Sequence, residues 1–185
     1  ALAFSPDGKK VAYVSNLNIY TEDITSGAIT KITKDGGGNI INGTFDWAYE
    51  EEFACRDGFQ WCPDSKHISF WNSDANQIRD FYMINNTDSV YSQIIPVEYP
   101  TIGQAPSPVK IGVINIDTKK IVWLGIPGDP QQNYLPRMEW LNTNAIFVQQ
   151  LNRHQNESNI YSCNPSSGTA TLLYTEKDKA WIDVY

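Results

Sequence analysis

The segment Phe4–Val14 reads Phe-Ser-Pro-Asp-Gly-Lys-Lys-Val-Ala-Tyr-Val, a turn sequence followed directly by strand-forming residues. Pro6 fixes one backbone dihedral and Gly8 accepts a positive φ, so the pair favours a tight turn. Val11–Val14 is rich in side chains that pack well on a pleated surface. The segment therefore predicts a turn that leads into a β-strand.

The same pattern continues and then recurs along the chain. Alternating residues predict a second strand at Ile19–Ile24, and Ser26-Gly27 predicts the turn into a third. The opening pattern returns at Phe59–Trp71 and, in a degraded form, at Met138–Val148. Each unit has the residues for an antiparallel sheet of about four strands, which cannot bury both faces alone. The repeats predict sheets that stack as blades of a β-propeller.

The spacing of the repeats indicates insertions. Equivalent positions lie 57 residues apart from Phe4 to Trp61 and 79 residues apart from Trp61 to Trp140, whereas a plain blade takes roughly 40–45 residues. We therefore predict an all-β fold, a partial β-propeller of about three antiparallel blades. The predicted blade-like units are about 1–40, 57–125 and 134–185, with a helix-bearing insertion at about 41–56 and a second insertion that includes 85–107.

Composition restricts the class of protein. The chain has 185 residues, with 14 basic against 21 acidic side chains and a net charge of −7. This charge repels nucleic acid and attracts cationic ligands. No apolar run approaches the roughly 20 residues needed to span a bilayer. Both ends, at Ala1 and Tyr185, fall inside patterned segments, which is typical of a piece of a longer chain.

The cysteines and histidines indicate no metal site. Cys55, Cys62 and Cys163 form no C-x-x-C pair, and His67 is the only histidine close to one of them in the sequence. Structural zinc needs about four converging ligands at a recognisable spacing. A Cys55–Cys62 disulfide and buried free thiols both remain open, and free thiols are the simpler interpretation. His67 and His154 are expected to be strand or surface residues.

The segment Asp46–Phe53, Asp-Trp-Ala-Tyr-Glu-Glu-Glu-Phe, combines an acidic run with aromatic side chains. Asp46 is a suitable N-cap and the following residues lack Gly, Pro and β-branched side chains, so a short helix is predicted. One interpretation is a solvated acidic helix. The other is a cation site, because neighbouring carboxylates repel one another unless a cation relieves them. Such a site would need shelter from water, because exposed ion pairs contribute only about 0–1 kcal/mol each.

These features occur in the order of a known family. Along the chain come Ser-Pro-Asp-Gly at 5–8, Asp-Trp-x-Tyr-Glu-Glu-Glu at 46–52, Trp-x-Pro-Asp at 61–64, Tyr-Pro at 99–100 with Gly103 before Pro-Ser-Pro-Val-Lys at 106–110, and Asn-Ile-Tyr at 159–161. The chain resembles the N-terminal propeller of dipeptidyl peptidase IV, in the prolyl oligopeptidase group of serine peptidases. The resemblance covers essentially the whole chain, and the glutamate motif is its specific part.

The resemblance implies a function. In that family an eight-bladed propeller covers an α/β-hydrolase domain, and two glutamates on a short helix bind the free α-amine of a peptide substrate. Dipeptides are then removed from the N-terminus, usually after Pro or Ala. By position these glutamates are Glu51 and Glu52. The residues that would shape the helix are Asp46, Trp47, Tyr49 and Glu50.

The resemblance also implies what this stretch does not contain. The assisting arginine would precede Ala1 and the Ser-Asp-His triad would follow Tyr185, so no catalytic residue is expected here and the missing hydrolase domain is the first partner. No cofactor is implied. A homodimer is expected, in a periplasmic, secreted or membrane-anchored protein. Cys62, Ser107 and Thr101-Ile102 depart from the common family residues, away from the amine site.

Two other functions remain open. The chain is alternatively a non-catalytic propeller scaffold that uses its acidic helix to bind a cationic partner. A glycosidase would need two carboxyl groups roughly 5–10 Å apart across a sugar. Adjacent glutamates are too close for that, and the sequence offers no partner acid.

Overall fold

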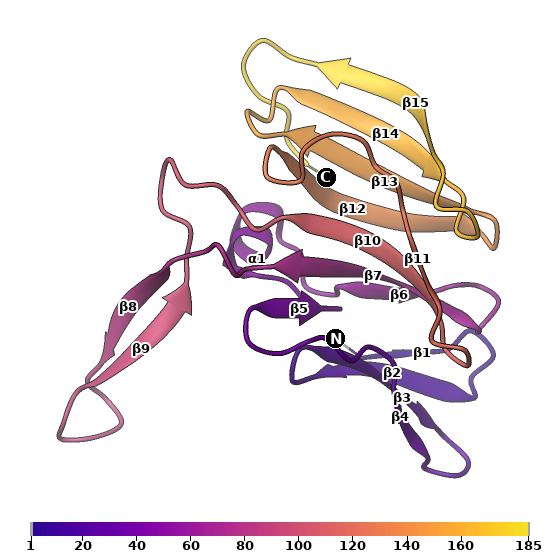
Figure 1. The fold of residues 1–185 in the computed structure, drawn as a ribbon, viewed down its shortest axis with the longest axis horizontal. Coiled ribbons are helices and arrows are strands. Elements are labelled where there is room, and N and C mark those ends of the chain that lie inside the picture. Colours follow the sequence, from indigo (N-terminus) through magenta and orange to yellow (C-terminus); the bar gives the residue numbers. More distant parts are fainter. Residues whose placement is uncertain (1, 185) are drawn as a thin grey trace.

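The structure, a computed structural model, describes residues 2–184 (Figure 1). Almost all of its regular secondary structure is antiparallel β-sheet. The first sheet contains β1 (Leu2–Phe4), β2 (Lys10–Ser15), β3 (Asn18–Asp23) and β4 (Ile29–Lys31). The second contains β5 (Ile40–Asn42), β6 (Phe59–Trp61), β7 (His67–Asp74), β10 (Val109–Asn115) and β11 (Ile121–Trp123). The third contains β12 (Asn133–Asn142), β13 (Ala145–Asn152), β14 (Glu157–Cys163) and β15 (Ala170–Lys177).

Two further elements project from the second sheet. The helix α1 (Trp47–Phe53) lies between β5 and β6 in the sequence, and the two-stranded hairpin of β8 (Asp80–Asn85) and β9 (Gln93–Glu98) lies between β7 and β10. Figure 1 shows the three sheets stacked in chain order, with the hairpin extending away from the stack. These sheets and the short helix confirm the predicted all-β fold. Within residues 2–184, no helix has the length and apolar character to cross a membrane.

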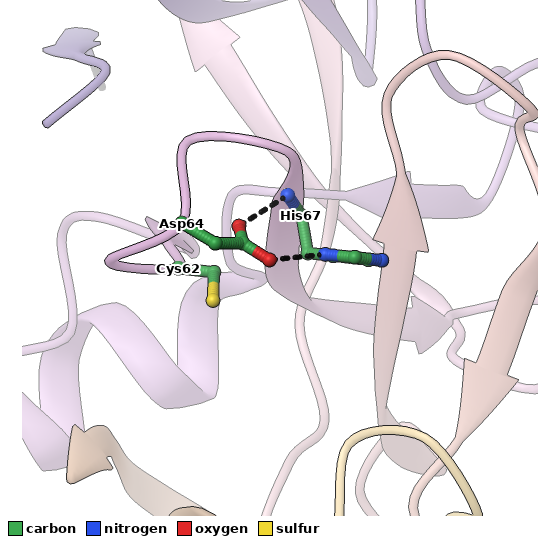
Figure 2. A group of neighbouring side chains, drawn as sticks. All are labelled: Cys62, Asp64 and His67. Carbon is green, nitrogen blue, oxygen red and sulfur yellow. Dashed lines mark hydrogen bonds and ion pairs between the residues drawn. The ribbon is translucent and has the colours of Figure 1, made fainter. Parts of the chain in front are cut away.

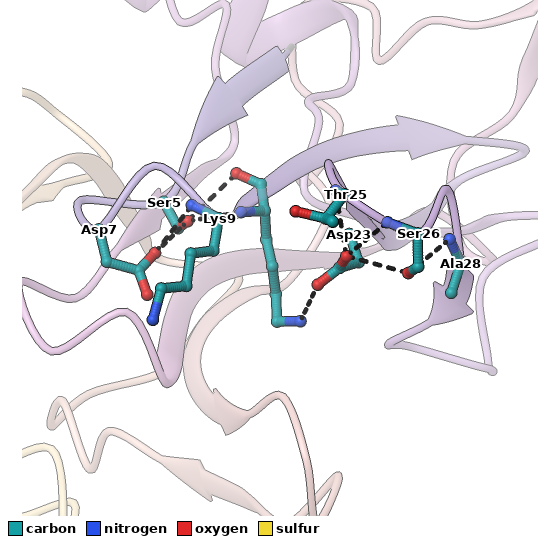
Figure 3. Close-up of polar contacts among 8 residues, drawn as sticks. Ser5, Asp7, Lys9, Asp23, Thr25, Ser26 and Ala28 are labelled. Carbon is teal, nitrogen blue, oxygen red and sulfur yellow. Dashed lines mark hydrogen bonds and ion pairs between the residues drawn. The ribbon is translucent and has the colours of Figure 1, made fainter.

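The same turn joins β1 to β2 in the first sheet and β6 to β7 in the second. Each turn has a residue with positive φ, Gly8 at 70° and Ser65 at 58°. In each, an aspartate carboxylate accepts a hydrogen bond from the backbone N–H two residues later, at 3.1 Å for Asp7 (Figure 3) and 2.8 Å for Asp64. The Asp7 N–H also donates to Ser65 Oγ at 3.0 Å, so the two turns contact each other.

A second repeated turn joins the last two strands of each of the three large sheets. It starts at an Asp or Asn and has a positive φ four residues later, at the pairs Asp23/Gly27, Asn115/Lys119 and Asn164/Gly168. Hydrogen bonds from the Ser26 backbone and hydroxyl, and from Lys10, lower the pKa of Asp23 to about 2 (Figure 3). The sequence pattern missed the turn in the second sheet, because Lys119 stands where the other two have glycine.

The strands β5 and β6 lie end to end along the same side of β7. Asn42 pairs with Asn72 and Phe59 pairs with Phe70, so only Trp71 separates the two pairings. The Trp71 C=O accepts a hydrogen bond from the N–H of residue 43 at 3.0 Å, and its N–H donates to the C=O of residue 58 at 3.0 Å. Residues 43–58 therefore form an excursion from one edge strand, and the predicted insertion at about 41–56 begins with β5 of the second sheet.

The neck of this excursion is the contact between Gly43 and Gly58. A Cβ atom on Gly58 would lie 2.5 Å from the carbonyl carbon of Gly43, which is too close for any side chain. Gly43 has a φ of 73°, in the left-handed region that favours glycine. Gly58 can lie against Gly43 only because it has no side chain, and a Cβ atom on Gly43 would lie 2.6 Å from Ile19 Cγ1 of the first sheet.

Two hydrophobic clusters bury both faces of the second sheet. Phe70 and Ile68 of β7 pack against the first sheet, where Ile19 is fully buried. Trp71 of β7 and Ile111 of β10 belong to the cluster that includes α1 and the third sheet. Successive residues of a strand face opposite sides, so β7 contributes to both clusters. Stacking of the sheets is the main source of burial.

The cysteines Cys55, Cys62 and Cys163 are buried free thiols. The simpler of the two interpretations is thus confirmed, and the Cys55–Cys62 disulfide is not formed. Burial raises the pKa of Cys62 to about 12 and that of Cys163 to about 11. These thiols are therefore protonated at neutral pH and behave as small apolar side chains.

Candidate functional site

The helix α1 has a defined start and end. Asp46 is the N-cap, and its side chain accepts a hydrogen bond from the Tyr49 N–H at 3.1 Å. The helix ends at Ala54, whose φ of 52° is left-handed, and the Cys55 N–H donates to the Tyr49 C=O at 3.1 Å. The helix predicted from the capping residue is therefore present.

The inner face of α1 is aromatic and buried. Tyr49 and Phe53, one turn apart, are 1% and 4% exposed. The Tyr49 ring stacks on Phe45 with centroids 5.8 Å apart and meets Tyr134 of β12 edge-on at 6.2 Å. Its hydroxyl accepts a hydrogen bond from the Leu135 N–H at 2.9 Å, and burial raises the pKa of Tyr49. These contacts fix the orientation of the helix about its axis.

The outer face of α1 presents the three glutamates. Glu50 Oε2 lies 3.6 Å from Arg56 Nη1, and water reaches both side chains, which are 41% and 66% exposed, so this ion pair is weak. Glu51 and Glu52 are exposed. Neither forms an ion pair within 4.0 Å in the part of the chain that the structure describes. Their carboxylates are therefore available to an external cation, whereas that of Glu50 already has a partner.

A cavity of about 370 Å³ borders Glu52. Its walls come from α1, the segment 99–106 and Trp181. Thr101 and Ile102, which were expected to lie away from the amine site, therefore line the cavity beside Glu52. Trp47 of α1 meets Tyr99 edge-on, with ring centroids 5.3 Å apart, and closes one side. The cavity therefore partly shields Glu52 from water, as a cation site needs. Glu51 does not line the cavity.

Arg153 provides a positive charge in the same cavity. Its guanidinium donates hydrogen bonds to the Tyr134 hydroxyl and, at 2.6 Å, to the Gln104 carbonyl, and it lies over the Tyr134 ring with 5.6 Å to the centroid. The cavity thus combines a carboxylate, a guanidinium and aromatic walls. Sequence reasoning did not identify Arg153, because no local pattern connects it to α1.

Cys62, Asp64 and His67 form a separate group of possible metal ligands, with ligand atoms within 4.8 Å of one another (Figure 2). The Asp64 carboxylate already accepts hydrogen bonds from the backbone N–H groups of Lys66 and His67, and Oδ2 lies 2.7 Å from His67 Nδ1. The Cys62 thiol is protonated at neutral pH because burial raises its pKa to about 12.

The other nitrogen of His67 is also occupied. Asn115 Oδ1 accepts from the N–H groups of Asp117 and Thr118, so its Nδ2 must point to His67 Nε2, at 3.1 Å. This fixes the tautomer with the proton on Nδ1, donated to Asp64. The group is explained as the hydrogen-bonded turn that begins β7, and sequence reasoning missed it because it counted only complete zinc patterns.

Comparison with known proteins matches the whole chain. The model of the family "Dipeptidyl peptidase IV (DPP IV) N-terminal region" matches residues 1–185. The rat protein named inactive dipeptidyl peptidase 10 is 26% identical over 97% of this chain and 23% of its own length. The probable dipeptidyl peptidase 4 of Emericella nidulans is 27% identical over 97% of this chain and 24% of its own. The chain spans about a quarter of the length of these relatives.

Solved structures give the same result. The crystal structure of Porphyromonas gingivalis dipeptidyl peptidase 4 matches 99% of this chain and 26% of its own, with a TM-score of 0.92 and 30% identity. A putative dipeptidyl aminopeptidase IV from Bacteroides ovatus, 23% identical, matches 98% of this chain and 24% of its own with a TM-score of 0.83 and supports the fold. The predicted partial propeller is thereby confirmed. The chain belongs to the dipeptidyl peptidase IV family and corresponds to its N-terminal region.

Proposed function

We propose that this chain is the substrate-recognition part of a serine exopeptidase that removes dipeptides from peptide N-termini, typically after Pro or Ala. In this proposal Glu51 and Glu52 bind the free α-amine of the peptide. The observation that carries it is the pair of exposed carboxylates on α1, which have no cationic partner among residues 2–184. The anchored helix and the cavity beside Glu52 support it.

The chemistry of the ammonium group fits two adjacent carboxylates. An ammonium ion has three N–H donors and no acceptor, so two carboxylates can bind it while a third partner completes its hydrogen bonds. Anchoring the amine at one point places a bond at a fixed number of residues from the N-terminus in the same position each time. The residues that cleave that bond belong, in this proposal, to the α/β-hydrolase domain of the full-length protein, which also shields Glu51 from water.

The first expected result is a pH dependence set by the substrate. The α-amino group of a peptide has a pKa of about 7.7–8.0, and only its protonated form binds to carboxylates. In the full-length enzyme, kcat/KM should therefore fall by about tenfold per pH unit well above that pKa. Steady-state kinetics between pH 6 and 10 measure this fall.

The control separates the substrate amine from groups of the enzyme. A dipeptide substrate with a fluorinated first residue has a lower amine pKa, and the midpoint of the fall should move down by the same amount. A midpoint that stays in place for both substrates would assign the titration to the enzyme and contradict this part of the proposal.

A homodimer of the full-length protein is also proposed, with the β8–β9 hairpin as a contact. The hairpin projects from the stack of sheets (Figure 1), and Tyr82 and Ile84 are 65% and 67% exposed. Large exposed apolar patches mark interaction sites. Tyr82→Asp with Ile84→Asp should convert the dimer to a monomer in sedimentation velocity, whereas Leu2→Asp, on the exposed edge of β1, should not. A monomeric wild-type protein would contradict the proposal.

One observation favours a second candidate, a non-catalytic binding scaffold. The rat relative is named inactive, although it matches this chain over the same length as the relatives named as peptidases. Assay of the full-length protein on a dipeptide substrate distinguishes the two. Binding of a free-amine peptide without turnover would favour the scaffold.

A further inference from the structure

The helix that carries the glutamates is held by a different sheet from the one it grows out of. The excursion begins and ends on the second sheet, yet the first strand of the third sheet, β12, provides its polar anchors. The Leu135 N–H donates to the Tyr49 hydroxyl at 2.9 Å, and Arg137 Nη1 donates to the Phe53 carbonyl at 3.0 Å. Two hydrogen bonds from one strand therefore contact α1 one turn apart.

A bulge in β12 makes these bonds available. The pairing of β12 with β13 shifts register between Tyr134 and Arg137, so Leu135 and Pro136 leave the regular ladder. A bulge frees backbone groups from the ladder, and Pro136 has no N–H to lose. The Leu135 C=O accepts from Trp71 Nε1 at 2.8 Å. The freed groups are thus used to hold the excursion and its neck.

Arg137 is committed to the end of α1. Its Nη1 donates to the carbonyls of Phe53 and Pro136, at 3.0 and 2.9 Å, and lies 3.6 Å from Cys55 Sγ. No carboxylate lies within 4.0 Å of it in the described range 2–184. The last carbonyls of a helix have no partner inside the helix, and arginine commonly satisfies them. Phe53 is the last residue of α1 and directly follows Glu52.

We propose that Arg137 is a positioning residue for the amine site, which rests on the proposed function of Glu51 and Glu52. By bonding the Phe53 carbonyl it fixes the last turn of α1, where both carboxylates originate. Two carboxylates can share one ammonium group only if their oxygens converge on it. Displacement of a binding group by about 1 Å can reduce activity by about 100-fold. Fixing the end of the helix can therefore affect activity by more than the free energy of one hydrogen bond would suggest.

The test is a comparison of Arg137→Met with Arg137→Lys in the full-length enzyme. The amine itself does not react, so we expect loss of its anchor to appear mainly as weaker substrate binding, which raises KM more than it lowers kcat. We expect Arg137→Met to raise KM for a dipeptide p-nitroanilide by about tenfold or more. Arg137→Lys, which keeps a donor, should recover part of this loss. Lys110→Met, which removes a cation stacked on Trp123, is the matched control and should leave KM unchanged.

A second comparison separates positioning from general stability. In a Glu51→Gln/Glu52→Gln background the anchor is already lost, so Arg137→Met should raise KM no further. An effect of the same size in both backgrounds would overturn the inference, and so would an unchanged KM in the single variant. If Arg137→Met does not fold, Tyr49→Phe, which removes the other bond from β12, carries the test with the same expected rise in KM.

The two proposals fail in different ways. If Glu51→Gln/Glu52→Gln leaves turnover of a free-amine substrate unchanged, the proposed function is wrong. If that double variant loses activity while Arg137→Met and Tyr49→Phe keep the wild-type KM, only the positioning role of β12 is wrong.

Discussion

Replacing Glu51 and Glu52 together by glutamine should lower kcat/KM of the full-length enzyme for a free-amine dipeptide substrate by about 10²- to 10⁴-fold. Glutamine keeps the size of the side chain but removes the charge that pairs with the ammonium group. A hydrogen bond to a charged group contributes about 1.5–3 kcal/mol when sheltered, and about 1.4 kcal/mol is a factor of ten. Two such bonds give the expected range.

The size of this loss also shows whether the two carboxylates are shielded from water in the full-length protein. The Glu51 and Glu52 side chains are exposed in the described part of the chain. Fully exposed ion pairs would contribute only about 0–1 kcal/mol each to binding of the ammonium group. A loss below about 30-fold would therefore mean that the site stays open to water in the full-length protein. Steady-state kinetics of the double variant and both single variants provide the measurement. Glu176→Gln, an exposed glutamate on β15, is the charge control, and unchanged turnover in the double variant would reject the amine site.

Tyr49→Ala should be the most destabilising substitution in this region. The Tyr49 side chain is fully enclosed, contacts three aromatic rings and accepts the Leu135 N–H bond. Truncating a large aromatic residue in a core costs about 3–5 kcal/mol, and leaving a buried N–H without a partner costs about 1–3 kcal/mol. We expect the loss to fall on α1 first, because Tyr49 joins that helix to β12.

Two measurements test this expectation. Urea unfolding of the wild-type and variant proteins gives the change in the free energy of unfolding. Hydrogen exchange of the amides in residues 46–54 gives the local stability of α1. Tyr49→Phe keeps the ring and should show only the smaller cost of the lost hydroxyl. If Tyr49→Ala cost less than about 0.5 kcal/mol, as surface substitutions do, then α1 would not depend on its buried face.

Local chemistry determined how much of the fold the sequence could predict. Gly8 and Asp46 act through their own backbone and near neighbours, so the turn and the helix start were both readable. Lys119 hid one turn, because its left-handed φ of 62° is uncommon for a residue with a side chain. The strands at Val11–Val14 and Ile19–Ile24 were predicted from their side-chain pattern, whereas the β8–β9 hairpin, part of which lies in the predicted insertion at 85–107, was not.

Contacts between distant residues limited the prediction of the site. Arg137 and Phe53 are far apart in the sequence, and only the bulge at Pro136 aims Arg137 at the helix end. Arg153 reaches the cavity beside Glu52 in the same way, through the fold rather than through a motif. The glutamates were predictable from the motif, but the residues that hold them were not.

The neck at Gly43 and Gly58 has a consequence for how such a protein can diverge. Because the chain leaves and re-enters the edge strand at adjoining positions beside Trp71, the intervening residues add nothing to the hydrogen-bond ladder of the sheet. The charge of their exposed side chains can therefore change without altering the strand pairing of the blade. Natural variation can therefore retune or abolish recognition of a peptide end while the propeller itself is inherited intact.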